Sequence, residues 1–265
     1  MLDLSAYAIA CGAALIAAVM CWLVSLLRND VSIVDSLWSL MFLLIVGVYQ
    51  FVGDPTGPRR WLVLLLVAIW ALRLSYHIAR RNHGQPEDRR YQAIRRNNEP
   101  NFRFKSLYIV FGFQALLAAI ISIPLLVASS GSSPLGWLDA MAVALWLAGM
   151  LFEIVGDAQL ARFSADPANR GRVLDTGLWR ITRHPNYFGE FTLWWGYYCF
   201  AMAAGGWWTV FSPLLMSFLL LRVSGVALME KDIGSRRKGY AEYVRQTNAF
   251  FPGPRRPPQS KMSEV

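Results

Sequence analysis

The chain alternates between long apolar segments and shorter polar segments that carry most of its charge. Apolar runs near 20 residues recur along it, which is about the length that an α-helix needs to cross the hydrocarbon core of a bilayer. The spans read from this pattern cover residues 5–27, 32–52, 61–79, 107–128, 137–160, 187–205 and 207–225. The pattern predicts an all-α integral membrane protein with seven transmembrane helices.

Composition favours the same class of protein. Of the 265 residues, 55% are hydrophobic and only 16% are charged, whereas soluble domains carry about 25% charged residues. The sequence has no internal repeat and no separate domain, so residues 1–251 are expected to form one seven-helix membrane domain. Residues 252–265 are rich in proline and polar residues and are predicted to form a disordered cytoplasmic tail.

Positive charge is concentrated in three polar segments, 80–105, 162–183 and 231–261, and contributes most of the net charge of +9. The loop at 129–136 and the Gly205–Gly206 connection carry no charge. The positive-inside rule then places the amino terminus outside and the carboxyl terminus in the cytoplasm, across the inner membrane if the source is bacterial. Topology and contact with anionic membrane lipid explain some of these residues. Nucleic acid is not an expected partner, because no soluble domain presents them.

The stretch from Asp175 to Glu190 is dense in charge and opens directly into the sixth apolar span. Ionisable groups at membrane depth cost about 2.5–3.5 kcal/mol each on insertion scales, so they usually face a polar cavity. Pro185 suits the start of a helix, whose free backbone N–H groups form a phosphate site together with nearby arginines. The candidate binding residues here are Arg172, Arg180, Arg183, His184, Asn186, Tyr187 and Glu190.

The fifth span contains two carboxylates, Glu153 and Asp157, four residues apart and therefore on one helix face. Gly156 allows another group to approach that face closely, and Arg162 follows just beyond the span. One interpretation is an interhelical ion pair that only orders the bundle. We favour a ligand pocket, because the next charged stretch supplies many further polar partners.

Asp35 lies within the apolar second span, with no lysine or arginine within six residues. A carboxyl group so placed is expected to retain its proton more readily and could donate a hydrogen bond or a proton. The alternative is a hydrogen bond to a serine of a neighbouring helix. Arg73 ends the third span on its cytoplasmic side and is expected to face the same cavity.

The sequence contains no motif typical of the other common cofactor or metal sites. There is no glycine-rich dinucleotide fingerprint after a strand and no Walker motif. No set of histidine, cysteine and acidic residues has metal-ligand spacing, so no metal site is predicted. The cysteines Cys11, Cys21 and Cys199 all lie in apolar spans and are expected to be packed thiols.

The run from Gly177 to Glu190 resembles the steroid 5-alpha-reductase family, in its bacterial branch. The surroundings of Asp35, the third-span exit from Arg73 to Arg90, and the seventh-span exit from Leu221 to Lys231 fit the same branch. The resemblance covers roughly residues 30 to 251. It implies a seven-helix membrane reductase that takes a hydride from NADPH bound on the cytoplasmic side. The implied substrate is a 3-oxo-Δ4 steroid or a similar lipophilic enone, which enters from the bilayer and is reduced at its conjugated double bond. The enzyme is expected to act as a monomer.

The resemblance also suggests residue roles. Asp35 and Tyr91 are the expected catalytic residues, and Asp35, Trp38 and Arg73 are expected to contact the substrate. The residues expected to bind NADPH are Glu153, Asp157, Arg162, Arg172, Arg180, Arg183, His184, Asn186, Tyr187, Glu190, Arg222 and Glu230. The chain departs from the family in three places: Glu153 replaces an asparagine, Asp35 stands alone where animal enzymes have a Gln-Glu pair, and Trp70 stands at the position of a tyrosine.

Two other functions remain open on the sequence. The Arg-His-Pro-x-Tyr core from Arg183 to Tyr187 is shared with isoprenylcysteine and phospholipid methyltransferases, which bind S-adenosylmethionine. The density of arginine favours NADPH, because its phosphates suit guanidinium groups and S-adenosylmethionine has none. The third possibility is a lipid-binding or scaffolding membrane protein whose arginines serve topology alone.

Overall fold

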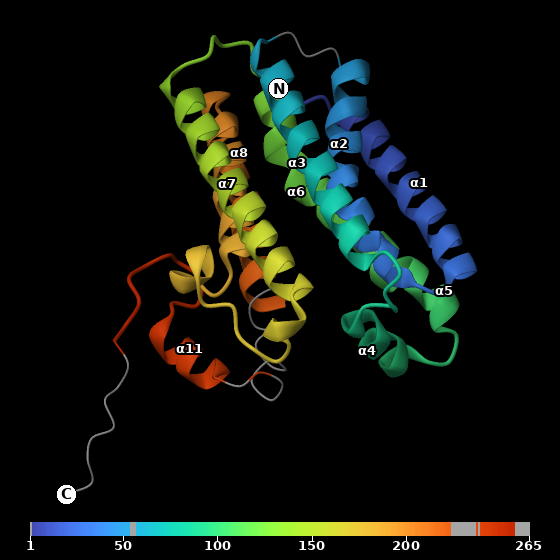
Figure 1. The fold of residues 1–265 in the computed structure, drawn as a ribbon. Helices are drawn as coiled ribbons and strands as arrows, with labels where there is room; N and C mark the ends of the chain where they lie inside the picture. Colours follow the sequence, from blue (N-terminus) through green and yellow to red (C-terminus); the bar gives the residue numbers. More distant parts are fainter. Residues whose placement is uncertain (1, 54–56, 224–236, 238, 258–265) are drawn as a thin grey trace, which may run out of the picture. The chain divides into compact units, whose positions relative to one another are not determined.

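A computed structural model describes residues 2–53, 57–223, 237 and 239–257, and all regular structure within these ranges is helical (Figure 1). Among the described residues, five helices are long and apolar enough to cross a membrane: Leu4–Arg28, Val31–Val52, Arg59–Asn82, Phe102–Ser130 and Trp137–Ala165. The prediction of a helical membrane protein is therefore confirmed. Of the two later predicted spans, 187–205 corresponds to α8, which has 19 residues and lies outside that set. The other, 207–225, corresponds to a shorter apolar helix, Trp207–Val223.

The described ranges contain a series of helical elements. In chain order they are α1 (Leu4–Arg28), η1 (Val31–Ile33), α2 (Val34–Val52), α3 (Arg59–Asn82), α4 (Arg89–Asn98), α5 (Phe102–Ser106), η2 (Leu107–Gly112), α6 (Phe113–Ser130), α7 (Trp137–Ala165), η3 (Pro167–Asn169), η4 (Gly177–Arg180), α8 (Pro185–Ala203), η5 (Trp207–Val210), α9 (Phe211–Phe218), η6 (Leu219–Val223) and α11 (Tyr240–Gln246). Both η2 and η6 are π-helical turns, a geometry that often occurs beside functional sites.

The chain divides into two compact units. Unit 1 comprises Met1–Asp139 and Tyr198–Ser212, and unit 2 comprises Ala140–Tyr197 and Pro213–Val265. The two segments that form each unit are far apart in the sequence. The expected single domain over residues 1–251 stays a prediction.

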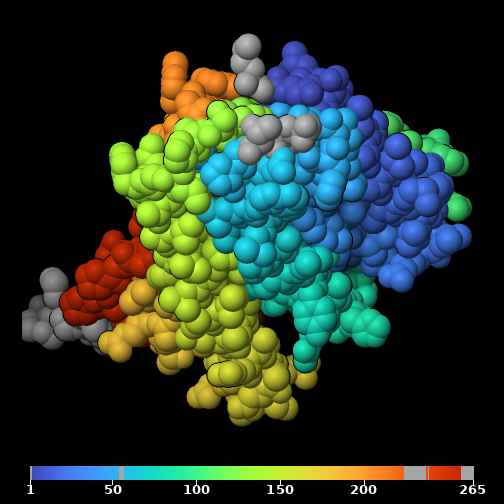
Figure 2. Space-filling view, turned by 90° about the horizontal axis from the view of Figure 1, so that it is seen from above, coloured from blue at the N-terminus to red at the C-terminus, as the bar shows by residue number. Residues whose placement is uncertain are grey.

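Unit 1 is a bundle in which α1, α2 and α3 lie side by side and α6 packs against them (Figures 1 and 2). α1 buries a stripe of alanines one turn apart, Ala6, Ala10, Ala14 and Ala18. Small side chains at this spacing let helices approach closely, which is how membrane helices gain packing energy. The opposite side of α1 is apolar and exposed, with Leu27 the most open of its large side chains. One face of α1 therefore suits packing against neighbouring helices, and the opposite face suits contact with lipid.

A buried ion pair joins the start of α3 to the start of α7 within unit 1. Arg59 Nε donates to Asp139 Oδ1 at 2.5 Å and Arg59 Nη2 donates to Asp139 Oδ2 at 2.9 Å. Both side chains are almost fully buried. Removing one partner would leave the other as an uncompensated buried charge. The charge distribution along the sequence predicts that Arg59 lies on the outer side of the membrane, where Asp139 balances its charge.

In unit 2 the backbones of α7 and α8 are in contact through glycines. A Cβ atom added to Gly149 would lie 2.6 Å from the carbonyl oxygen of Gly189, and one added to Gly196 would lie 2.9 Å from that of Ala142. Only glycine permits this separation, because any side chain would force the helices apart. The same contact holds the side chain of Glu153 against Gly189, so this carboxylate residue lies against the backbone of α8.

The carboxyl-terminal segment is fastened to the loop that precedes α8, and Figure 1 shows α11 beside that loop. Arg183 Nη1 donates to the carbonyls of Val244 and Thr247 at 3.1 and 2.8 Å. Further along, the Gly253 N–H donates to the Ile181 carbonyl at 3.0 Å. Composition predicts disorder from residue 252, but residues 252–257 are held by partners that are distant in sequence. Residues 258–265 lie outside the described ranges.

Candidate functional site

In unit 1, Asp35 lies in the first turn of α2 and receives two hydrogen bonds from α4. The Tyr91 hydroxyl donates to Asp35 Oδ1 at 2.6 Å, and Arg90 Nη2 donates to Asp35 Oδ2 at 2.6 Å. Asp88 caps α4 by accepting from the Arg90 N–H, and it also accepts from Arg90 Nε at 3.0 Å. The helix cap therefore fixes the guanidinium that faces Asp35.

Glu87 anchors α4 to the start of the second membrane helix. Its Oε1 accepts from the Val31 backbone N–H at 2.9 Å and from Arg95 Nη2 at 2.7 Å. These bonds join the loop after α3 to the turn before α2, although the two segments are 56 residues apart. The anchoring explains why a carboxylate of α2 meets two consecutive side chains of α4.

A fourth side chain, Gln114, completes this group. Its Nε2 donates to the Tyr91 hydroxyl oxygen at 3.1 Å. Its Oε1 is buried and has no hydrogen-bond partner within the described residues. Gln114 follows the π-helical turn η2 in the fourth apolar span. We call Asp35, Arg90, Tyr91 and Gln114 the Asp35 cluster.

The electrostatics of the Asp35 cluster favour a protonated tyrosine. Burial, and then the negative charge of Asp35, hold the pKa of the Tyr91 hydroxyl well above its usual value, although Arg90 opposes both effects. Burial alone would lower the pKa of Arg90, but the adjacent carboxylate of Asp35 raises it. Tyr91 therefore keeps its proton and Arg90 its charge.

Asp35 and Tyr91 were predicted from the sequence as catalytic residues, and the structure brings their side chains together; the catalytic role stays a prediction. Arg90 and Gln114 were not identified from the sequence. Arg90 is 55 residues from Asp35 in sequence, so no local pattern reveals the pair. The one signal for Gln114 is its place as a lone amide in an apolar span.

The other two predicted substrate contacts, Trp38 and Arg73, lie on α2 and α3. Trp38 lies on α2 one turn beyond Asp35, and its ring meets Phe42 edge to face with centroids 5.0 Å apart. Arg73 is half-buried on α3. Their contact with a substrate stays a prediction.

In unit 2, the polar residues of α7 meet the start of α8. Asn186 Nδ2 donates to Asp157 Oδ1 at 3.3 Å. Glu190 is buried one turn further along α8, and its Oε1 accepts from Trp194 Nε1 at 3.0 Å. Glu153 and Asp157 are also buried. We call Glu153, Asp157, Asn186 and Glu190 the Asp157 cluster.

Close packing positions the start of α8 against α7. A Cβ atom added to Gly156 would lie 3.2 Å from Pro185 Cγ, so the glycine leaves just enough room for the proline. The buried His184 stacks on Tyr187, with ring centroids 5.8 Å apart and planes 25° apart. The helix therefore begins at Pro185, as predicted, and its first turn faces the carboxylates of α7.

The predicted arginines fall into two groups. Arg162, Arg172, Arg180 and Arg222 are exposed. Arg183 is buried, and its guanidinium donates to carbonyls of the carboxyl-terminal segment. Contacts of all five arginines with a cofactor stay predictions. Glu230 lies outside the described residues.

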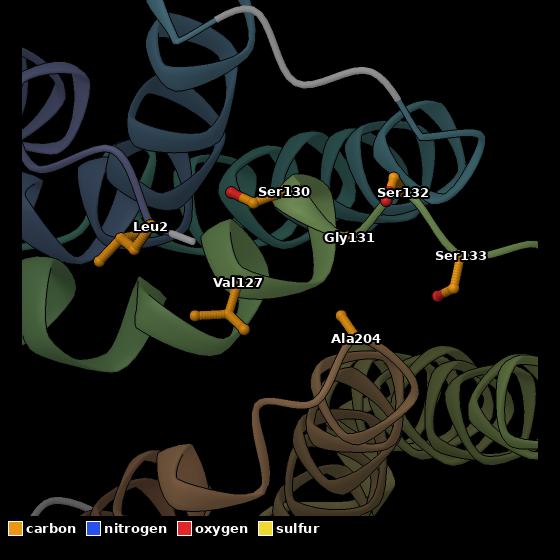
Figure 3. A pocket seen from close by; sticks show the side chains of 7 residues that line it. All are labelled: Leu2, Val127, Ser130, Gly131, Ser132, Ser133 and Ala204. Carbon is orange, nitrogen blue, oxygen red and sulfur yellow. The ribbon is translucent and has the colours of Figure 1, made fainter.

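Each unit also contains a cavity. The cavity in unit 2 measures about 640 Å³ and is lined by Arg170, Gly171, Arg172, Val173, Asp175, Gly239, Glu242, Tyr243 and Arg255. The cavity in unit 1 measures about 410 Å³ and is lined by Leu2, Val127, Ser130, Gly131, Ser132, Ser133 and Ala204 (Figure 3). Three serines give the second cavity a neutral polar wall. None of the residues that the sequence selects lines it.

Comparison with known proteins shows the family. Residues 21–247 match the family described as "Protein of unknown function (DUF1295)", and the chain belongs to it. An uncharacterized protein of Schizosaccharomyces pombe is 26% identical over 264 residues, which cover 87% of this chain and 75% of that relative. No solved structure matches the chain.

Proposed function

We propose that this member of the DUF1295 family is a multi-pass membrane reductase that uses NADPH. It reduces the conjugated carbon–carbon double bond of a 3-oxo steroid or a similar lipophilic enone. In this proposal α8 and Trp207–Val223 complete seven spans, with the amino terminus outside and the carboxyl terminus in the cytoplasm. The substrate enters from the bilayer and the cofactor binds from the cytoplasm.

The observation that carries the proposal is the Asp35 cluster. Reduction of an enone adds a hydride to the β-carbon and leaves negative charge on the carbonyl oxygen, so a donor must face that oxygen. Tyr91 supplies such a donor, because burial and Asp35 keep its hydroxyl protonated. Asp35 orients the hydroxyl through the 2.6 Å hydrogen bond. Arg90 balances the carboxylate, which would otherwise be costly at membrane depth.

We infer the action of Tyr91 on substrate binding from its hydrogen bonds. Its single proton points to Asp35, and its oxygen accepts from Gln114. Rotation about the phenol C–O bond redirects the proton to the substrate carbonyl, while Asp35 keeps the hydrogen bond from Arg90. Solvent supplies the proton that the α-carbon takes up, so one hydride and one proton are added in total.

The residues of unit 2 fit the cofactor. NADPH, when bound, supplies the hydride. The buried carboxylates Asp157 and Glu190 can accept hydrogen bonds from ribose hydroxyls or a carboxamide N–H, and Asn186 can both donate and accept. The exposed guanidinium of Arg172 suits phosphate oxygens.

A second candidate follows from the same residues. Buried carboxylates also suit the sulfonium cation of S-adenosylmethionine, and the Arg-His-Pro-x-Tyr core occurs in methyltransferases that bind it. We therefore retain methyl transfer to a prenylated or phospholipid substrate as the alternative. The Asp35 cluster favours reduction, because methyl transfer has no need for a buried tyrosine held protonated.

One experiment separates these functions. The detergent-purified protein is heated with NADPH, NADH or S-adenosylmethionine, because a ligand that binds the native state raises its unfolding temperature. Stabilisation by NADPH, with reduction of progesterone or testosterone seen by mass spectrometry, supports the reductase. Stabilisation by S-adenosylmethionine alone supports the methyltransferase, and stabilisation by none of them contradicts both.

A further inference from the structure

The cavity of unit 2, which we call the arginine cavity, is built from two segments that are distant in sequence. One wall comes from residues 170–175, between α7 and α8, and the other from residues 239–255 around α11. The Tyr243 hydroxyl donates to the Trp179 carbonyl at 2.6 Å and so joins the second wall to η4, which follows the first wall in sequence. Most of its lining residues, including Arg255 and Asp175, do not belong to the predicted cofactor residues.

Arg255 is held in a defined position on this wall. Its Nε donates to Gln246 Oε1 at 2.8 Å, and its guanidinium forms an ion pair with Asp175 at 3.0 Å. The backbone around it is also fixed, because the Arg256 N–H donates to the Gln246 carbonyl at 2.9 Å. A guanidinium positioned in advance loses less entropy when it binds an anion.

The charge of the arginine cavity is positive. Arg170, Arg172 and Arg255 line it together with two carboxylates, Asp175 and Glu242. Arg245 pairs with Glu242, and Arg255 pairs with Asp175, so both carboxylates already have cationic partners. Arg170 and Arg172 are exposed and add positive charge that these carboxylates do not balance.

The remaining wall suits a flat ring and a close backbone approach. The ring of Tyr243 lines the cavity while its hydroxyl is bonded to Trp179. Gly171 and Gly239 have φ angles of 77° and 81°, where side chains are strained. The volume of about 640 Å³ falls within the range of about 300–1,000 Å³ that small-molecule sites occupy.

We propose that the arginine cavity binds the adenosine 2′-phosphate end of NADPH and that Arg255 determines the preference for NADPH over NADH. This inference rests on the proposed function. A phosphate ester accepts two parallel hydrogen bonds from one guanidinium, which Arg255 presents in a fixed orientation. An acidic residue that accepts from the ribose 2′-hydroxyl selects NADH, whereas an arginine accommodates the 2′-phosphate. Here the acidic residue, Asp175, is already bound to Arg255.

The test uses the full-length protein in neutral detergent and measures dissociation constants for adenosine 2′,5′-bisphosphate and for 5′-AMP. We expect the wild type to bind the bisphosphate more tightly. Arg255→Gln should weaken bisphosphate binding about tenfold or more, as the loss of a charged hydrogen bond predicts, and should change 5′-AMP binding little. Arg256→Gln is the matched control, because it removes the same charge from an exposed neighbour that does not line the cavity.

Two further variants keep the inference testable if Arg255→Gln unfolds. Arg255→Lys retains the charge but loses the planar fork, so it should weaken bisphosphate binding less than Arg255→Gln does. Asp175→Asn removes the competing carboxylate and should strengthen bisphosphate binding. Equal affinities of all variants for the bisphosphate would overturn the inference.

The outcomes also separate this inference from the proposed function. If the wild type fails to bind NADPH, the proposed function fails. If NADPH binds but Arg255→Gln weakens NADPH and NADH equally, or changes neither, the reductase proposal survives and the inference is wrong. Binding of phosphatidylglycerol in nanodiscs is measured as well, because a lipid headgroup is the other source of phosphate. Loss of lipid binding in Arg255→Gln with unchanged bisphosphate binding would assign the cavity to a lipid headgroup and overturn the inference.

Discussion

In the Asp35 cluster of unit 1, a carboxylate of one membrane helix takes both of its donors from α4, a helix outside the membrane spans. In the Asp157 cluster of unit 2, polar residues come from two helices whose backbones touch at Gly149 and Gly189. The first group is closed by short hydrogen bonds among its own members, which suits a site that holds a proton in place. The second presents buried carboxylates beside a helix start and exposed arginines, which suits binding of a large polar ligand. The two clusters therefore suit chemistry and binding respectively, and variants in each should separate these functions.

The largest expected effect comes from Tyr91→Phe. Loss of the hydroxyl removes the donor to the carbonyl oxygen, and loss of one such donor typically costs about 10²–10³-fold in rate. We expect turnover of an enone to fall by that amount while NADPH affinity stays unchanged. Tyr108→Phe is the control, because Tyr108 is an exposed tyrosine of the neighbouring η2 turn. Full turnover by Tyr91→Phe would remove Tyr91 from the proposed role.

Asp157→Asn should weaken NADPH binding rather than slow turnover. The carboxylate is buried and accepts from Asn186, so its replacement removes an acceptor for the cofactor. Hydrogen bonds to charged groups are worth about 1.5–3 kcal/mol, which corresponds to about tenfold to a hundredfold weaker NADPH binding. Titration of NADPH measures this loss, and turnover at saturating NADPH should be retained. A variant that binds NADPH normally would contradict the assignment of Asp157.

The contact between α7 and α8 can be tested without changing a polar group. Gly149→Ala would place a Cβ atom 2.6 Å from the Gly189 carbonyl oxygen, and overpacking of this kind costs about 1–3 kcal/mol. Thermal unfolding in detergent should show the loss. Gly47→Ala in α2 is the matched control, because its Cβ would meet nothing within 4 Å. Equal unfolding temperatures for the two variants would show that the α7–α8 contact is looser than described.

The smallest expected effect concerns the pH dependence of turnover. A raised pKa at Tyr91 means that the protonated form persists as pH rises. Turnover should therefore show no loss of the acid form near pH 10, where an ordinary tyrosine ionises. Because Arg90 opposes the upward shift, Arg90→Gln should move any alkaline limb to still higher pH. An alkaline limb at or below pH 10 in the wild type would contradict this description of the site.

The helix starting at Pro185 shows how far local sequence can go. Proline at the first helical position is a local signal, and it was sufficient to predict that a helix begins at Pro185. The structure also brings Asn186 to Asp157 through a 3.3 Å hydrogen bond, whereas binding of a ligand there stays a prediction. The arginines could not be sorted in the same way, because Arg183 and Arg180 look alike in sequence. Burial against the carboxyl-terminal segment distinguishes Arg183 from Arg180.

By itself the sequence determined the class of the protein, because long apolar runs must be buried in lipid and their backbone groups satisfied within helices. It also indicated that a helix begins at Pro185 and which carboxylates share a face. Only the tertiary structure decided that Arg90 meets Asp35, that Gln114 reaches Tyr91 and that Arg255 joins Asp175. These pairs join segments that are far apart in the chain. Their formation depends on how loops fold back onto helices, and hydrophobic periodicity carries no information about that.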